Sequence, residues 1–262
     1  MTLKNILRAQ RNSDYIVTSR MQMVLMRNPN IHYSDAVGDF IRDVLTTKPR
    51  VRSGSFSASS AGQCHRRQVL SYIGIDTGQV NGYQLQNIFE DGKWRHMRWQ
   101  AIMLQSGLLD QAEVPLDWPK MRSKGSMDGQ GTVPDNHPRA EWRGKEFGFE
   151  LKGVSPYVFN SYVQQGGKLE HKKQVHRYFL ASGVDLFVIL YEDKATQNWH
   201  EWVLEPDPVL LAEQQMELEA LNTAVDNKIL PPVLPECQQG KGTEYKACPY
   251  GKDSNICLGI TQ

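Results

Sequence analysis

The chain has 262 residues, of which 40% are hydrophobic and 23% are charged, and its formal net charge is +1 at pH 7. This length and apolar content suit one large or two small globular domains with a proper core, so no disulfide is needed to hold the fold together. The near-zero net charge excludes a protein that is basic throughout, and any nucleic-acid surface must be a local patch. The first 25 residues contain no continuous apolar run, so we expect neither a signal peptide nor a membrane span, and a cytoplasmic location.

Apolar periodicity predicts that helices and strands alternate along the chain. In chain order we expect helices over residues 3–48, at Cys64 and over 85–104; strands over 114–118, 121–133 and 146–154; a helix over 168–181; strands over 185–191 and 199–204; and a helix over 208–227. This order predicts an α/β fold with a central mixed sheet flanked by helices. Three prolines at 231, 232 and 235 then end regular structure and introduce a cysteine-rich tail.

Two acidic positions on separate predicted strands indicate a metal-dependent hydrolytic centre. Asp128 is surrounded by glycines, and the triplet Glu150-Leu151-Lys152 lies on a strand whose alternation puts Glu150 and Lys152 on one face. Carboxylate oxygens are hard ligands for magnesium or manganese, and such an ion supplies what phosphodiester hydrolysis requires. A lysine beside them would orient the attacking water or compensate developing negative charge.

A second glutamate-x-lysine triplet, Glu192-Asp193-Lys194, competes with the first. Its nearest upstream acid, Asp185, lies within the same short predicted strand, whereas Asp128 lies on a strand separate from that of Glu150. A site with two carboxylate ligands needs that separation, so we favour Glu150.

His96 lies on the predicted helix over 85–104, on a stripe with Ile88, Gly92, Trp99 and Met103 that we expect to face inward. Taken alone, a histidine in this position is either a satisfied core residue or a metal ligand.

The cysteines are divided one against three: Cys64 stands alone, and Cys237, Cys248 and Cys257 crowd into the last 26 residues. In a reducing compartment, clustered cysteines favour metal or cluster ligation over disulfides. Zinc sites prefer two close pairs, but the gaps here are 172, 10 and 8 intervening residues. This spacing favours an iron-sulfur cluster over zinc.

Together these motifs resemble the RecB-like branch of the PD-(D/E)XK nucleases, and within it the iron-sulfur subset formed by CRISPR-associated RecB-like exonucleases, their phage-encoded relatives and the AddB nuclease domain. The resemblance rests on the order Cys64, Gly92-x-x-x-His96, Gly125-Ser-Met-Asp128, Glu150-Leu-Lys152, Gln174-x-x-x-Tyr178, Cys237, Cys248 and Cys257. It covers about residues 56–262 and implies three parts: a helical N-terminal extension over 1–55, a restriction-endonuclease-like core over 56–235, and a C-terminal iron-sulfur segment over 236–262.

The resemblance also implies a role for each matching residue. The implied metal ligands are His96, Asp128, Glu150 and the main-chain carbonyl of Leu151; the other implied catalytic residues are Lys152, Gln174 and Tyr178; the implied 4Fe-4S ligands are Cys64, Cys237, Cys248 and Cys257; and the implied DNA contacts are Arg66 and Arg67.

The implied function is a Mg²⁺- or Mn²⁺-dependent deoxyribonuclease that degrades single-stranded or frayed DNA ends, with 5′ to 3′ polarity. Its setting would be DNA recombination, repair or degradation in a bacterium or a phage-infected cell. The implied partners are DNA, further copies of the chain, and a recombination or helicase protein, because the sequence has no Walker loop of its own. Two alternatives stay open: a non-catalytic DNA-binding or CRISPR-adaptation subunit, and a structure-selective endonuclease.

Overall fold

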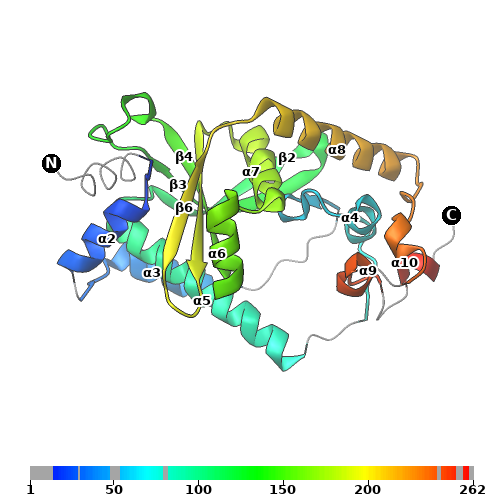
Figure 1. Ribbon diagram of the computed structural model, residues 1–262, viewed down its shortest axis with the longest axis horizontal. Helices are drawn as coiled ribbons and strands as arrows, with labels where there is room; N and C mark the ends of the chain where they lie inside the picture. Colours follow the sequence, from blue (N-terminus) through cyan, green and yellow to red (C-terminus); the bar gives the residue numbers. More distant parts are fainter. Residues whose placement is uncertain are drawn as a thin grey trace.

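The computed structural model describes residues 14–28, 30–47, 54–78, 82–240, 243–251 and 256–259 (Figure 1). Its helices are α2 (Thr18–Arg27), α3 (Asp35–Thr46), α4 (His65–Tyr72), α5 (Tyr83–Gln105), α6 (Pro156–Gln165), α7 (Leu169–Ser182), α8 (Pro208–Asp226), α9 (Thr243–Ala247) and α10 (Ile256–Gly259). Its strands are β1 (Phe56–Ser57), β2 (Gln111–Trp118), β3 (Ser123–Thr132), β4 (Glu146–Val154), β5 (Leu186–Asp193) and β6 (Trp199–Leu204). No helix in the described ranges is long and apolar enough to cross a membrane.

The six strands form one mixed sheet, which confirms the predicted class. The strand order is β1-β3-β4-β5-β6, and β2 pairs with β3. The β1–β3 and β4–β5 pairs are parallel, and the other pairs are antiparallel. Strand β5 is buried along its whole length, because helices cover both faces of the sheet at its centre (Figure 1).

Strands β3 and β4 stop pairing where the acidic residues begin. Gly129 opposite Phe149 is the last paired position, and Asp128 and Glu150 are the next residue along each strand. The two strands therefore separate at this point, and their side chains face a space that neither backbone fills.

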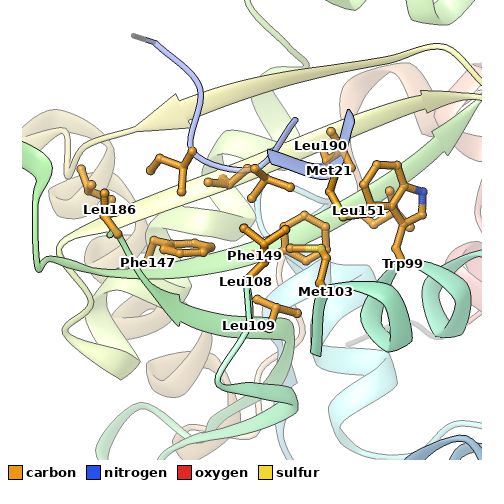
Figure 2. Packing of buried hydrophobic residues seen from close by; sticks show 14 of the residues in the cluster. Met21, Trp99, Met103, Leu108, Leu109, Phe147, Phe149, Leu151, Leu186 and Leu190 are labelled. Atoms are coloured by element: carbon orange, nitrogen blue, oxygen red, sulfur yellow. The ribbon is translucent and has the colours of Figure 1, made fainter. Parts of the chain in front are cut away.

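The two faces of the sheet have separate apolar cores, as a period of two requires. Phe147, Phe149 and Leu151 of β4 pack against Trp99 and Met103 of α5 (Figure 2). On the opposite face, a second core of β3, β5 and α7 residues contains Met127, Val175, Tyr178, Phe179, Phe187 and Ile189. Because Glu150 and Lys152 alternate with the first set, they lie on the side of α7.

The described part of the N-terminal segment, residues 14–28, packs into the first core. Ile16, Val17 and Met21 are buried there. The backbone N–H groups of residues 16–18 donate to the carboxylate of Glu201 on β6, which is also buried. Burial raises the pKa of Glu201 to about 7 although these N–H groups oppose the shift. The predicted N-terminal extension thus includes a segment that is part of the core of the sheet domain, while residues 1–13 and 48–53 lie outside the described residues.

The predicted inward stripe of α5 holds only for its second half. Trp99 and Met103 are buried, but Ile88 is 53% exposed. The first turns of α5 extend beyond the body of the sheet, where no element covers them in Figure 1. The prediction was therefore wrong for Ile88.

Helices α4, α9 and α10 gather with the end of α8 at one end of the molecule, away from α2 and α3 (Figure 1). Two small apolar clusters hold this lobe together. One joins Phe56 and Val69 to Leu218 and Leu221, and the other joins Leu70 to Tyr250 and Cys257, among further residues. Cys64, at the start of α4, is thereby brought close to the C-terminal tail.

Candidate active site and cysteine cavity

Asp128 is aimed across the gap between β3 and β4. Its Oδ2 accepts a hydrogen bond of 2.7 Å from the backbone N–H of Leu151. The carboxylate thus replaces the strand partner that this N–H has lost, and it lies beside Glu150 without pairing with it directly. Two carboxylates from separate strands are brought to one place, as the sequence motif requires.

Glu150 is buried and has one satisfied and one unsatisfied oxygen. Its Oε1 accepts from Lys152 Nζ at 2.7 Å and from Gln174 Nε2 at 2.8 Å. Its Oε2 is buried and has no hydrogen-bond partner in the part of the chain that the structure describes. Burial and the charge of Asp128 raise the pKa of Glu150 to about 7, against the opposing effects of Lys152 and His96.

Lys152 stays protonated in this setting. Burial lowers its pKa, but the carboxylates of Glu150 and Asp128 outweigh burial, and the net shift is upward. Its Nζ also donates to Gln174 Oε1 at 3.0 Å. The ammonium group is therefore held between a carboxylate and an amide oxygen, with one N–H remaining.

Gln174 and Tyr178 face the site from one side of α7, one helical turn apart. Gln174 Nε2 donates to Tyr178 Oη at 2.7 Å, and that hydroxyl donates to the Ser126 carbonyl at 3.0 Å. Gly125 leaves room for the ring, because a Cβ there would lie 3.0 Å from Tyr178 Cε1. This chain of hydrogen bonds connects α7 to β3 and fixes the amide that orients Lys152.

His96 reaches the same place from α5, with its Nδ1 3.1 Å from Asp128 Oδ1. Burial lowers the pKa of His96, but the Asp128 carboxylate outweighs burial, so the pKa is raised. The imidazole is partly exposed, and it closes the side of the site opposite α7.

Two residues that the sequence did not single out complete the wall around Asp128. Gln100, one turn after His96, donates from Nε2 to the main-chain oxygen of Asp128 at 2.8 Å and to Glu113 Oε1 at 2.7 Å. Glu113 has a positive φ of 52°, and Glu113 and Asp128 are the one facing position left unpaired in the otherwise continuous register of β2 with β3. The helical spacing of Gln100 from His96 is the one signal in the sequence that could have found it.

The donor set fits a hard divalent cation. Within the described ranges, no three His, Cys, Asp or Glu side chains already converge on a single ion position. However, the Oε2 of buried Glu150 has no hydrogen-bond partner among the described residues, and the charges of Asp128 and His96 act on the same carboxylate. A buried carboxylate oxygen without a donor is costly, and a cation would relieve that cost.

The four cysteines line one cavity in the lobe of α4, α9 and α10, together with Arg67, Tyr245, Tyr250 and other residues. None forms a disulfide. Burial, with the charges of neighbouring thiols, raises the pKa of Cys237 and Cys257. The lone cysteine and the three tail cysteines are therefore brought together, although they do not converge closely enough to hold a single ion.

The two predicted DNA-contacting arginines lie in this lobe. Arg66 is 3% exposed and donates from Nη1 to the Pro231 carbonyl at 2.9 Å. Arg67 lines the cysteine cavity. Both arginines thus lie in the cysteine lobe, and their contact with DNA stays a prediction.

The competing triplet lies elsewhere. Glu192 is fully buried on β5 and is surrounded by α5 side chains, with none of the acidic-site residues among its partners in the described part of the chain.

No protein-family model matches the chain, and no curated protein is similar to it in sequence. Among solved structures, it is similar to LHK-Exo from Laribacter hongkongensis, an alkaline exonuclease, in complex with dAMP. The TM-score is 0.50, and the two share 17% identity over 67% of this chain and 89% of that chain. The chain has the fold of an alkaline exonuclease.

Two further structures match at lower scores. A second structure of LHK-Exo has a TM-score of 0.46 and 17% identity over 67% of this chain and 89% of that chain. The structure of SSO0001 also has a TM-score of 0.46, with 14% identity over 94% of this chain and all of that chain.

Proposed function

We propose that the chain is a divalent-metal-dependent deoxyribonuclease of the PD-(D/E)XK superfamily, in its RecB-like iron-sulfur branch. The observation that carries this proposal is the placement of Asp128 beside a buried Glu150, whose Oε2 has no partner among the described residues, and a protonated Lys152. Such a centre suits hydrolysis of a phosphodiester, because it combines a cation site with a fixed positive charge.

The position of each residue determines its proposed role. His96, Asp128, Glu150 and the Leu151 carbonyl would hold Mg²⁺ or Mn²⁺, which when bound supplies charge neutralisation and an acidic water. Lys152 directs an N–H at the charge that develops on the phosphate.

Gln174 keeps that ammonium in place through its 3.0 Å contact. Tyr178 in turn fixes Gln174, because its hydroxyl bridges α7 and β3. The positive charge is thus set in position before DNA arrives.

The substrate proposed is single-stranded DNA or a frayed end, degraded from its 5′ end in bacterial or phage DNA recombination, repair or degradation. This polarity and setting are what the resemblance to the RecB-like iron-sulfur nucleases implies. We place the protein in the cytoplasm. We propose a helicase or recombination protein as one partner and further copies of the chain as another.

We further propose that Cys64, Cys237, Cys248 and Cys257 hold a 4Fe-4S cluster with a structural role. Their shared cavity supports a joint ligand set, and the lack of a close cysteine pair in the sequence favours a cluster over zinc. Anaerobic purification should give a brown protein with about four irons per chain and little zinc; a colourless, zinc-loaded protein would contradict this assignment.

The activity is tested on end-labelled linear single-stranded DNA and on circular single-stranded DNA, with Mn²⁺, Mg²⁺ or EDTA. We expect the linear strand to be shortened only with metal, the circle to survive, and Asp128→Asn to be inactive. Asp185→Asn is the matched control, because Asp185 is an exposed acid that accepts from Glu146 N at 3.2 Å and does not touch the site.

Each other outcome points to a different function. Binding of DNA without metal-dependent degradation indicates a non-catalytic subunit. Cleavage of the circle indicates an endonuclease. Release of nucleotides from the 3′ end would reverse the proposed polarity.

A further inference from the structure

Glu192 is the most deeply buried acid outside the proposed site, and all of its described partners belong to α5. Its Oε2 accepts from Trp99 Nε1 at 2.9 Å and lies 3.1 Å from Arg95 Nη1. Its Oε1 accepts from Arg98 Nη2. One carboxylate on β5 therefore binds the side chains of three residues of a single helix, at positions 95, 98 and 99.

This anchor reaches across β4 at a position that lacks a side chain. Gly153 is paired with Glu192 in the sheet, and a Cβ at Gly153 would lie 2.8 Å from Arg95 Cδ. Gly153 directly follows Lys152, so Arg95 crosses β4 one residue from the proposed catalytic lysine, on the face opposite the lysine side chain. The indole of Trp99 packs next to Leu151 and Leu190 in the core (Figure 2).

The contacts continue outward along the same side of α5. Asp91 is 3.3 Å from Arg95 Nη2 and 3.6 Å from Lys194 Nζ, and Arg98 Nη1 donates to Gln197 Oε1 at 3.0 Å. The β5–β6 turn thus holds the helix as well.

His96 lies between these anchored residues in the sequence, and its Nδ1 is 3.1 Å from Asp128 Oδ1. We infer that Glu192 is a positioning residue: it sets the rotation and height of α5 so that His96 meets Asp128 at the metal site. The inference rests on the proposed function, since it assigns His96 to that site. The second glutamate-x-lysine triplet would then support the metal site indirectly, because Glu192 holds α5, the helix that carries the proposed metal ligand His96.

The test compares Mn²⁺ binding, followed by EPR of the free ion, in four proteins: wild type, Glu192→Gln, His96→Ala and the double variant. Removing a group that orients a metal ligand weakens metal affinity by roughly 10–100-fold, and we expect a loss in that range for Glu192→Gln. In the His96→Ala background the same substitution should have no further effect, because the residue acts through His96.

Glu201→Gln is the matched control. Glu201 is an equally buried glutamate on the next strand, and its partners are the N–H groups of residues 16–18. Its substitution should leave Mn²⁺ affinity unchanged even if the protein melts at a lower temperature. If Glu192→Gln does not fold, Arg98→Gln removes one arm of the anchor from a half-exposed side chain and should weaken Mn²⁺ binding in the same direction.

Unchanged Mn²⁺ affinity in Glu192→Gln, or an equal loss with and without His96, overturns the inference. If the wild type shows no Mn²⁺ site that Asp128→Asn removes, the proposed function fails instead. Hydrogen exchange then decides the inference by itself: faster exchange of amides 95–101 in Glu192→Gln than in Glu201→Gln supports it, and equal exchange refutes it.

Discussion

Replacing Glu150 by glutamine should abolish cleavage and at the same time stabilise the metal-free protein. Folded Glu150 holds its proton up to about pH 7, whereas the unfolded residue loses it near 4.5. The folded state therefore binds more protons in this window, and the free energy of unfolding falls as the pH rises through it.

The penalty for the ionised carboxylate at pH 8 follows from the shift. The pKa of Glu150 rises from 4.5 to about 7, and at about 1.4 kcal/mol per pKa unit this rise corresponds to a penalty of about 3 kcal/mol. Glutamine imitates the protonated acid and avoids this penalty. For a protein of this size, about 3 kcal/mol corresponds to roughly 6–12 °C in the melting midpoint.

The assay is thermal unfolding in anaerobic EDTA buffer at pH 5 and pH 8, combined with metal-dependent degradation of labelled DNA. We expect Glu150→Gln to melt higher than wild type at pH 8, to match it more closely at pH 5, and to be inactive. Glu201→Gln is the companion variant, because burial also raises the pKa of Glu201 to about 7. The Glu201→Gln substitution should remove a similar part of the pH dependence of the melting temperature, and the variant should still degrade DNA. An active Glu150→Gln protein, or one that melts lower than wild type at pH 8, would refute the reasoning.

Three further variants test the remaining parts of the site. Lys152→Met should bind Mn²⁺ by EPR but fail to degrade DNA, because it loses the fixed positive charge and keeps both carboxylates; loss of Mn²⁺ binding would argue against this division of roles. Tyr178→Phe removes the hydroxyl that bridges α7 and β3, and its kcat should fall by about tenfold, the equivalent of one hydrogen bond, whereas an unchanged kcat would show that the bridge is dispensable. Cys64→Ser should lose iron, measured by metal analysis, and should melt at a lower temperature than wild type, because ligation energy is folding energy; full iron content would exclude Cys64 as a ligand.

Sequence periodicity predicted the acidic strand well because a half-buried strand records its geometry in its own residues. The expected strand over 146–154 is β4, and its alternation placed Glu150 and Lys152 together on one face. Helix α6, in contrast, was missed although Pro156 at its start and Gly166 at its end are typical helix boundaries. Its apolar positions are interrupted by polar ones, so the periodicity alone was too weak to show it.

The contacts of Gln100 and Glu192 could not be predicted from the chain, because their partners are set by tertiary packing. Gln100 bonds to groups 13 and 28 residues away, and Glu192 bonds to Trp99 across 93 residues. The separate strand of Asp128 was enough to favour Glu150 over Glu192, but it gave no role for Glu192. The anchoring role became visible only with the sheet register, which places Glu192 opposite Gly153 and away from the gap between β3 and β4.

Helix α7 joins the acidic site to the cysteine lobe. One side of it presents Gln174 to Glu150, and Arg177, 1% exposed, donates from the other side to Gln214 of α8 at 2.9 Å. Arg177 Nη2 also lies 3.2 Å from Glu217 Oε1, and Glu217 accepts from the N–H of Gly62, in the turn that leads to Cys64.

Buried charged contacts of this kind resist rearrangement, because separating them leaves an uncompensated charge in a dry interior. The Arg177–Glu217 contact is buried, whereas the 3.2 Å contacts of the Gly62 N–H with the Glu217 carboxylate are exposed. A displacement of the Cys64 turn that keeps the Gly62 contacts would pull on Glu217, and through Arg177 on the helix that holds the amide orienting Lys152. A displacement that breaks the Gly62 contacts would leave α7 in place.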